Sequence, residues 1–136
     1  MKTEAVLRVF AGLGAAAFVG FAGLQFNDPD PVGWVAIYGC AAVACAFVAA
    51  GRGPWWVPAA VAVAAFLWAL LLVPEVLGHL ALADLTREMN TQMPEIEVGR
   101  EIGGLLITTA WCGVTSWGRS RLPRSGRTER PAAGSL

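Results

Sequence analysis

The sequence Gln-Phe-Asn-Asp-Pro-Asp-Pro at residues 25–31 separates two long apolar segments and decides how the chain folds. Pro29 and Pro31 lack a backbone donor, and each disfavours helical geometry in the residue before it. A helix arriving from the N-terminal side must therefore end near Asn27, and the chain must turn before the next apolar segment. The stretch is also rich in carboxylates and amides, which are costly inside a membrane. We predict that residues 25–31 form a polar turn between two membrane-spanning helices.

The composition extends this prediction to the whole chain. Hydrophobic residues make up 56% of the 136 residues and charged residues 15%, so the chain is more apolar than an ordinary soluble domain. Four segments are apolar and about 17–21 residues long, enough for a helix rising ~1.5 Å per residue to cross a hydrocarbon core. These predicted spans are residues 5–25, 32–50, 56–73 and 102–118. We predict an all-α, polytopic membrane protein whose residues 1–118 form a four-transmembrane-helix bundle, followed by a basic, disordered cytoplasmic tail at residues 119–136.

The first apolar segment follows two basic residues, as the apolar part of a signal peptide does. It is long for a signal peptide, and no convincing small-residue cleavage site follows it, so we predict a retained helix. Gly12, Ala16 and Gly20 recur every four residues. We expect this small-residue stripe to let another helix pack closely.

The later connections differ in how clearly the sequence defines them. Gly-Arg-Gly-Pro at residues 51–54 predicts a tight turn. Pro74 predicts a kink or an end of the third helix, and residues 75–93 fit either a helix on the membrane surface or a continuation of that helix. The fourth span is the least apolar. Its threonine and serine hydroxyls can bond to their own helix, which predicts that one of its faces contacts protein rather than lipid.

A second polar stretch, Glu-Ile-Glu-Val-Gly-Arg-Glu at residues 95–101, precedes the last apolar segment. If the fourth helix begins one turn early, Glu97, Arg100 and Glu101 share one face, because residues three and four apart are neighbours on a helix. Gly99 and Gly103 would let another helix approach that face. If the first and fourth helices are neighbours, the two polar stretches converge in one pocket. The candidate site residues are Gln25, Asn27, Asp28, Asp30, Trp34, Tyr38, Glu97, Arg100 and Glu101.

The charges fix the expected orientation in the membrane. With four spans, both termini and the turn at residues 51–54 share one side, which carries Lys2, Arg8, Arg52 and the arginines of the C-terminal tail. The opposite side carries most of the acidic residues. Because basic loops stay in the cytoplasm, we predict a multi-pass protein of the bacterial inner membrane with both termini cytoplasmic. Both polar stretches then face outward.

Three interpretations of the polar residues stay open. In the first, Arg100 forms ion pairs with Glu97, Glu101 and Asp28 or Asp30, and the cluster is structural, since charges near lipid are costly unless paired. In the second, the carboxylate and amide oxygens bind a divalent cation, or Arg100 binds a phosphate or carboxylate head group. In the third, paired carboxylates act as general acid and base.

Other aromatic and reactive residues carry weaker signals. Trp34 lies near the start of the second span, where an interfacial aromatic belongs, and Tyr38 lies one turn deeper on the same side. Trp68 and Trp111 lie mid-span, which favours packing. His79 is the single histidine and fits an exposed interfacial position better than a metal site. The three cysteines form no Cys-x-x-Cys pair and are expected to pack as small apolar residues; they are Cys40, Cys45 and Cys112.

The two polar stretches together resemble the transmembrane protein 220 family of small helical membrane proteins. The first family motif, Gln-x-Asn-Asp-Pro-Asp followed by Trp and Tyr, is matched by Gln25, Asn27, Asp28, Pro29, Asp30, Trp34 and Tyr38. The second motif, Glu-x-Gly-Arg-Glu followed by a small and apolar run ending in Ala-Trp, is matched by Glu97, Gly99, Arg100, Glu101, Gly104, Leu105, Ile107, Thr109, Ala110 and Trp111.

The resemblance covers roughly residues 5–117, with two departures. A basic tail follows the Ala-Trp helix where animal members continue with apolar sequence, and Ile96 and Val98 interrupt the acidic run before Gly-Arg-Glu. The resemblance implies a helical membrane fold and the positions of the polar motifs. It implies no biochemical activity, because none is established for the family.

The preferred function from sequence is therefore a non-catalytic integral membrane protein whose outward polar pocket binds a cation, a polar head group or a partner. Two alternatives are an intramembrane enzyme that uses paired carboxylates on a lipid or small polar substrate, and a subunit of a larger membrane complex. Membrane lipid is an expected partner and nucleic acid is not. A homo-oligomer or a membrane-protein partner is compatible with the sequence, which assigns no metal or cofactor.

Overall fold

The computed structural model describes residues 1–85 and 94–123, and it describes side chains at residues 1–78 and 98–123. Within these residues the chain forms four α-helices, and one turn of 3₁₀ helix, η1 (Gln25–Asn27), continues the first of them. The α-helices are α1 (Lys2–Leu24), α2 (Pro31–Ala49), α3 (Trp56–Leu85) and α4 (Pro94–Arg121). The predicted all-α fold class is confirmed.

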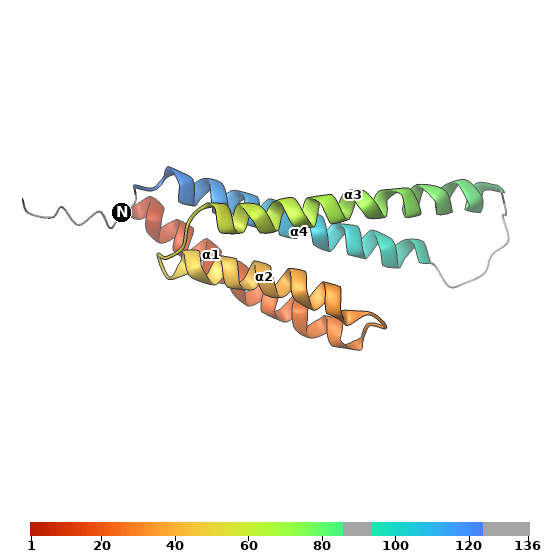
Figure 1. The fold of residues 1–136 in the computed structure, drawn as a ribbon, viewed down its shortest axis with the longest axis horizontal. Coiled ribbons are helices and arrows are strands. Elements are labelled where there is room, and N and C mark those ends of the chain that lie inside the picture. The colour runs from red at the N-terminus through yellow and green to blue at the C-terminus, as the bar shows by residue number, and fades with distance from the viewer. Residues whose placement is uncertain (86–93, 124–136) are drawn as a thin grey trace, which may run out of the picture.

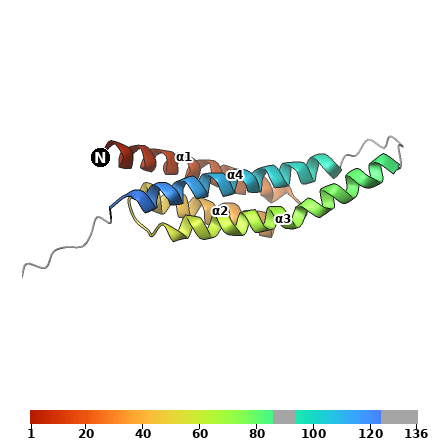
Figure 2. The ribbon, with the colours of Figure 1, turned by 90° about the horizontal axis from the view of Figure 1, so that it is seen from above.

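The helices form two antiparallel hairpins, α1 with α2 and α3 with α4 (Figures 1 and 2). Each helix contacts its hairpin partner far more than the other hairpin. The N-terminus, the α2–α3 turn and the end of α4 lie together at one end of the molecule, called here the turn end. The other end, called the polar end, carries residues 25–31 and the start of α4, and the two hairpins diverge toward it (Figure 1).

The polar turn folds as the prolines dictate. The helix tightens into η1, and Asp28, which precedes Pro29, has the extended backbone angles φ −78° and ψ 151°. Pro31 is the first residue of α2, where its missing donor costs no helical hydrogen bond. The predicted turn between two helices is therefore confirmed.

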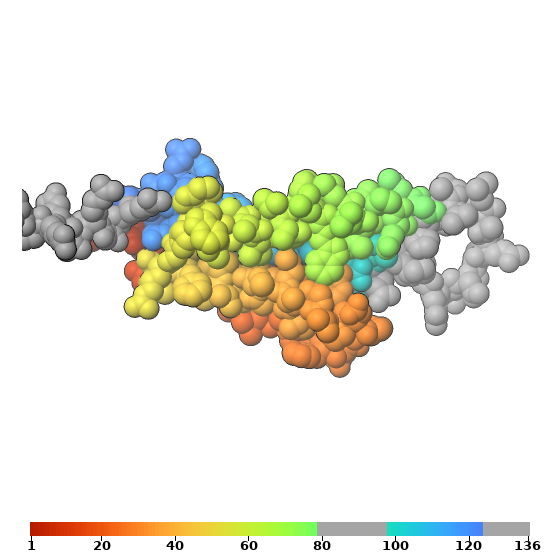
Figure 3. All heavy atoms as spheres, in the orientation of Figure 1, coloured from red at the N-terminus to blue at the C-terminus, as the bar shows by residue number. Residues whose placement is uncertain are grey.

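Small side chains fill the space between the hairpins. The central core contains several alanines and two cysteines, with Phe18, Tyr38 and Leu105 among its larger members. In the space-filling view the side chains of α2 and α3 meet along the middle of the molecule (Figure 3). Large apolar side chains such as Leu13, Phe66 and Leu71 are instead exposed. This distribution suits a bundle in lipid, where close helix packing needs small residues and the apolar solvent accepts large ones.

Three helical stretches of the described residues are long and apolar enough to cross a membrane: Lys2–Asn27, Pro31–Ala49 and Trp56–Gly78. The fourth helix, α4, is less apolar because it carries several hydroxyl and glycine residues. Thr108, Thr115 and Ser116 are buried on its protein-facing side. The Thr108 hydroxyl donates to the Gly104 carbonyl at 2.9 Å. The predicted protein-facing polar side of this helix is confirmed.

Several predicted boundaries were too short. The third helix continues through Pro74 to Leu85. Of the two predictions for residues 75–93, a continuation of this helix is therefore correct up to Leu85. The helix α3 changes direction in its later part (Figure 2). The fourth helix begins at Pro94 rather than residue 102 and ends at Arg121 rather than residue 118. The described residues do not include residues 86–93 or the tail from residue 124. The side chain of His79 is also outside the description.

The small-residue stripe predicted on the first helix contacts another helix only in part, since an added Cβ at Gly12 would meet the Ala49 Cβ of α2 at 3.8 Å. An added Cβ at Gly20 would meet no atom within 4 Å, and Ala16 is exposed. The buried face of α1 is formed by Leu7, Ala11, Gly14 and Phe18. Both sets follow helical spacing, so spacing alone did not distinguish the lipid-facing side from the protein-facing side.

Candidate functional site

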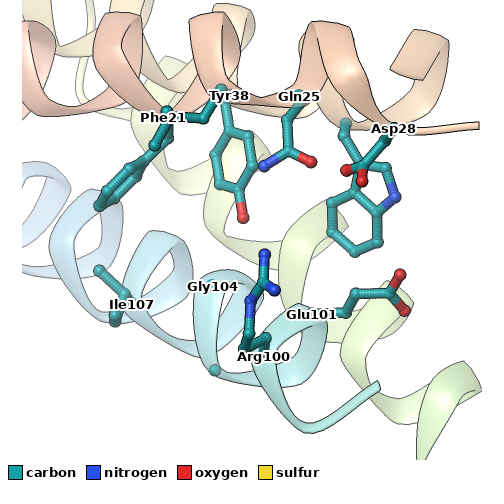
Figure 4. A pocket seen from close by; sticks show the side chains of 11 residues that line it. Phe21, Gln25, Asp28, Tyr38, Arg100, Glu101, Gly104 and Ile107 are labelled. Carbon is teal, nitrogen blue, oxygen red and sulfur yellow. The ribbon is translucent and has the colours of Figure 1, made fainter. Parts of the chain in front are cut away.

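A cavity of about 330 Å³ lies at the polar end, between the α1–α2 turn and α4 (Figure 4). Residues from three helices and the turn surround it, and they fall into a polar group and an apolar group. Its lining consists of Phe21, Leu24, Gln25, Asp28, Trp34, Tyr38, Arg100, Glu101, Gly103, Gly104 and Ile107. Residues of both polar stretches therefore line one cavity: Gln25 and Asp28 from the first, and Arg100 and Glu101 from the second.

The first wall comes from the end of α1 and the polar turn. A 3₁₀ helix has about three residues per turn, so residues three apart lie on the same side. Gln25 and Asp28 have this spacing, and both line the cavity. Asn27 and Asp30 are exposed and do not line it. Asn27 is the last residue of η1, and Asp30 lies beyond that turn as the N-cap of α2, so neither residue belongs to this wall of the cavity.

The facing wall comes from α4. Figure 4 shows Arg100 and Glu101 extending from adjacent positions of this helix toward the turn. Gly104 follows Arg100 at i+4 and Ile107 at i+7, so these residues continue the same helix face. The prediction that the fourth helix starts early enough to present Arg100 and Glu101 is confirmed. Glu97 lies in α4, but its side chain lies outside the description.

Aromatic side chains of α2 form the inner wall. Tyr38 is 4% exposed and packs against Phe18, Phe21 and Trp34, with ring centroids 5.7–6.3 Å apart. An added Cβ at Gly104 would overlap the Tyr38 hydroxyl, so the glycine permits the close approach of α2 and α4 here. The predicted close-packing glycines were Gly99 and Gly103, and neither has a neighbour within 4 Å of an added Cβ.

Trp34 also lines the cavity, in the first turn of α2. The indole is 9% exposed and stacks on Trp68 of α3 at a centroid distance of 4.7 Å. It therefore packs between helices, where it joins the two hairpins below the polar turn. The packing role predicted for Trp68 is confirmed by the same contact, and that of Trp111 by its stacking on Phe10 at 4.1 Å.

The polar groups are arranged asymmetrically within the cavity. In Figure 4 the Arg100 guanidinium points toward the Tyr38 hydroxyl and the Gln25 amide. The Asp28 and Glu101 carboxylates lie farther along, toward the outer end of the molecule. The cavity thus presents hydrogen-bond donors, including one cation, on its inner side and two carboxylates near its mouth.

Five lining residues were not among the site residues predicted from the sequence: Phe21, Leu24, Gly103, Gly104 and Ile107. A signal for them exists in the helical spacing. Phe21 and Leu24 precede Gln25 and Asp28 by four residues each, and Gly104 and Ile107 follow Arg100 on the same face. Extending each polar stretch along its helix would have found the apolar half of the cavity.

The three cysteines lie away from the cavity, and the metal expectation concerns the whole described structure. Among residues 1–78 and 98–123, no group of three or more His, Cys, Asp or Glu side chains is placed to hold a metal ion. Cys45 and Cys112 are buried in the central core and lie within hydrogen-bonding reach of one another. Cys40 is exposed on α2.

Comparison with known protein families identifies the chain. The family described as "Transmembrane family 220, helix" matches residues 17–117. The chain belongs to this family. The match confirms the resemblance seen in the two polar motifs, and it covers every residue that lines the cavity. No curated protein and no solved structure matches the chain. Membership establishes an integral membrane protein with several spans.

Proposed function

We propose that this protein binds the polar head group of an amphiphilic ligand in the cavity between the α1–α2 turn and α4, without catalysing a reaction. The observation that carries the proposal is the two-part lining of that cavity. Arg100, Glu101 and Asp28 provide charges toward the membrane surface, and Phe21 and Ile107 provide an apolar side toward the membrane interior. A ligand with both a charged and an apolar part satisfies both halves.

The dimensions support a small head group. Sites for small molecules commonly occupy about 300–1,000 Å³, and the cavity of about 330 Å³ lies at the lower end of that range. The hairpins diverge at this end, and α1 makes few contacts with α4. The apolar part of a ligand can therefore extend between these helices into the surrounding lipid.

A bare divalent cation is less well suited to the same cavity. Calcium and magnesium prefer a shell of oxygen ligands, and here a guanidinium shares the space with the two carboxylates. The positive charge of Arg100 opposes a second cation at close range. The same guanidinium favours a phosphate or carboxylate, which it can bind through two parallel hydrogen bonds.

The proposal includes an orientation. The turn end carries Lys2, Arg8, Arg52 and Arg119, and such basic ends stay in the cytoplasm. We place both termini in the cytoplasm of a bacterial cell and the cavity at the outer face of the inner membrane. A fluorescent reporter fused to the C-terminus should then fold and fluoresce, whereas a periplasm-dependent phosphatase at the same position should be inactive. The reverse pattern would contradict the orientation.

Blocking the apolar half of the cavity tests the binding function. Ile107 lines the cavity and Leu106 is an exposed neighbour that does not. Native mass spectrometry of the detergent-purified protein, titrated with short-chain phospholipids, should show bound lipid for wild type and for Leu106→Trp, and about tenfold less for Ile107→Trp. Equal lipid binding by all three proteins would contradict a site in this cavity.

The same spectra report the assembly state. A homo-oligomer or a co-purifying membrane protein would appear as an additional mass, which addresses the alternative of a subunit in a larger complex. The alternative of an intramembrane enzyme predicts that Glu101→Gln abolishes a turnover that wild type shows on a lipid or small polar substrate.

A further inference from the structure

We infer that the ligand is zwitterionic, with a phosphate joined by a short linker to a primary ammonium, as in the head group of phosphatidylethanolamine. This inference rests on the proposed function and specifies the chemistry of its ligand. It is carried by the order in which donors, cation and carboxylates occur along the cavity.

The inner part of the cavity suits a phosphate. Arg100 points toward the Tyr38 hydroxyl and the Gln25 amide (Figure 4). A guanidinium, a phenol and an amide together offer several donors to one small group of oxygens. Arginine binds phosphate through charge-assisted hydrogen bonds, which are stronger than neutral ones. A single phosphate placed here can be recognised from α1, α2 and α4 at once.

The outer part of the cavity suits an ammonium group. Asp28 and Glu101 come from opposite walls, and both carboxylates lie on the outer side of Arg100 (Figure 4). A primary ammonium has three donors and no acceptor, so it can donate to both carboxylates simultaneously. Carboxylates retain several acceptor positions, so an existing contact of Glu101 does not prevent this second role.

The order of these groups follows the order of a phospholipid in a membrane. Arg100 and Glu101 are adjacent in α4, but their side-chain ends differ in depth: in Figure 4 the Ile107 side chain lies deepest, the Arg100 guanidinium follows, and the Glu101 carboxylate lies toward the outer end. In a phospholipid with an ethanolamine head group the acyl chains lie deepest, the phosphate follows and the ammonium is outermost. The apolar part of the cavity therefore contacts the acyl chains, and Arg100 contacts the phosphate. The two carboxylates then contact the ammonium.

Two related head groups fit less well. A quaternary ammonium is usually held against exposed aromatic faces, but Trp34 is 9% exposed and stacks on Trp68 and Tyr38. An anionic glycerol head group would satisfy Arg100 and leave Asp28 and Glu101 facing a group of like or no charge. The primary ammonium is the one that uses both carboxylates.

Binding measurements with a lipid series test the inference on the wild-type protein. In detergent, short-chain phosphatidylethanolamine should bind at least about tenfold more tightly than phosphatidylcholine or phosphatidylglycerol with the same chains, since one charge-assisted contact contributes about this factor. Similar affinity for all three lipids, or preference for either of the other two, would overturn the inference. It would leave the proposed function intact, whereas absence of binding by every lipid would overturn both.

Variants assign the preference to the two carboxylates. Asp28→Asn should lower the preference for phosphatidylethanolamine over phosphatidylglycerol about tenfold, while the neighbouring Asp30→Asn, outside the cavity, should leave it unchanged. Arg100→Gln should weaken binding of both lipids. Equal effects of Asp28→Asn and Asp30→Asn would contradict the placement of the ammonium.

The source of the phosphate–ammonium group can be distinguished in the same assay. If a membrane lipid supplies it, soluble phosphoethanolamine should compete only weakly, because it lacks the apolar part that contacts Phe21 and Ile107. If a free solute supplies it, phosphoethanolamine should bind as tightly as the lipid. Either result supports the shared chemistry, and a failure of both compounds to bind would overturn it.

Discussion

The turn end and the polar end of this molecule use charged residues in opposite ways. At the turn end, side chains from α1 and α4 donate to carbonyls at the end of α2 and in the α2–α3 connection. Arg8 Nε donates to Ala49 at 2.9 Å, Ser116 Oγ to Trp55 at 2.8 Å, and Arg119 to Gly51 and Gly53, each at 3.3 Å. At the polar end, charged side chains from the turn and α4 border a cavity of about 330 Å³.

The difference indicates which charges stabilise the fold and which are available for the proposed ligand. The turn between α2 and α3 leaves carbonyls outside both helices and therefore without helical partners, and two of its residues are glycines with positive φ values of 72° and 82°. Arg119 donates to two of these carbonyls and thereby fixes α4 to the connection between the two hairpins. At the polar end the hairpins diverge (Figure 1), and the charged side chains there line the cavity. We therefore expect substitutions at the two ends to have different consequences.

The largest expected effect lies between the two ends, where α1 meets α4. An added Cβ at Gly14 would overlap the indole of Trp111, which stacks on Phe10. Gly14→Ala should therefore lower the free energy of unfolding by about 2–3 kcal/mol through overpacking. Gly20→Ala is the matched control on the same helix, because an added Cβ there meets nothing within 4 Å. Reversible unfolding in detergent would measure both, and equal stabilities would contradict the packing of α1 on α4.

A smaller effect is expected at the turn end. Arg119→Gln should lower the free energy of unfolding by about 1–2 kcal/mol, because it removes two charge-assisted hydrogen bonds to the turn. Ligand binding at the polar end should not change. Arg121→Gln serves as the control, since this exposed arginine near the end of the same helix lies over the Trp117 ring. A loss of lipid affinity in Arg119→Gln would show that the two ends are not independent.

The smallest stability change is expected at the polar end. Gly104→Ala should displace the Tyr38 hydroxyl and cost about 1 kcal/mol in unfolding, since only the tip of that side chain must move. Its effect on lipid binding should be larger than its effect on stability, because the hydroxyl lies in the cavity. Gly103→Ala, with no neighbour within 4 Å, should change neither quantity appreciably. Equal binding by Gly104→Ala and wild type would remove Tyr38 from the site.

Much of this architecture could be predicted from the sequence, because membranes constrain it strongly. Apolar length predicted the helices, and the prolines at residues 29 and 31 predicted the polar turn. Two membrane-spanning helices separate residues 25–31 from residues 95–101, so the two stretches are expected at the same end of the bundle. Both stretches contribute residues to the cavity lining. The early start of α4 at Pro94 then placed Arg100 and Glu101 on a helix, as their spacing had suggested.

The sequence did not predict which face of a helix contacts protein, or which residues make the close contacts between helices. Helical spacing is satisfied equally by Gly12, Ala16 and Gly20 and by the truly buried Ala11, Gly14 and Phe18. In lipid both faces of a helix are apolar, so hydropathy does not distinguish them. The role of Arg119 at the turn was missed for a related reason: a basic residue near a helix end was interpreted only as a determinant of topology.

The most direct test of the difference between the two ends compares Arg100→Gln with Arg119→Gln. Unfolding in detergent would be measured for both variants and wild type, with and without short-chain phosphatidylethanolamine at about 100 times its wild-type dissociation constant. The lipid should stabilise wild type and Arg119→Gln by roughly 2.7 kcal/mol. Arg100→Gln should retain nearly wild-type stability without lipid and gain little from it. If Arg100→Gln is instead as unstable as Arg119→Gln and still responds fully to the lipid, Arg100 is a structural residue and the cavity is not the binding site.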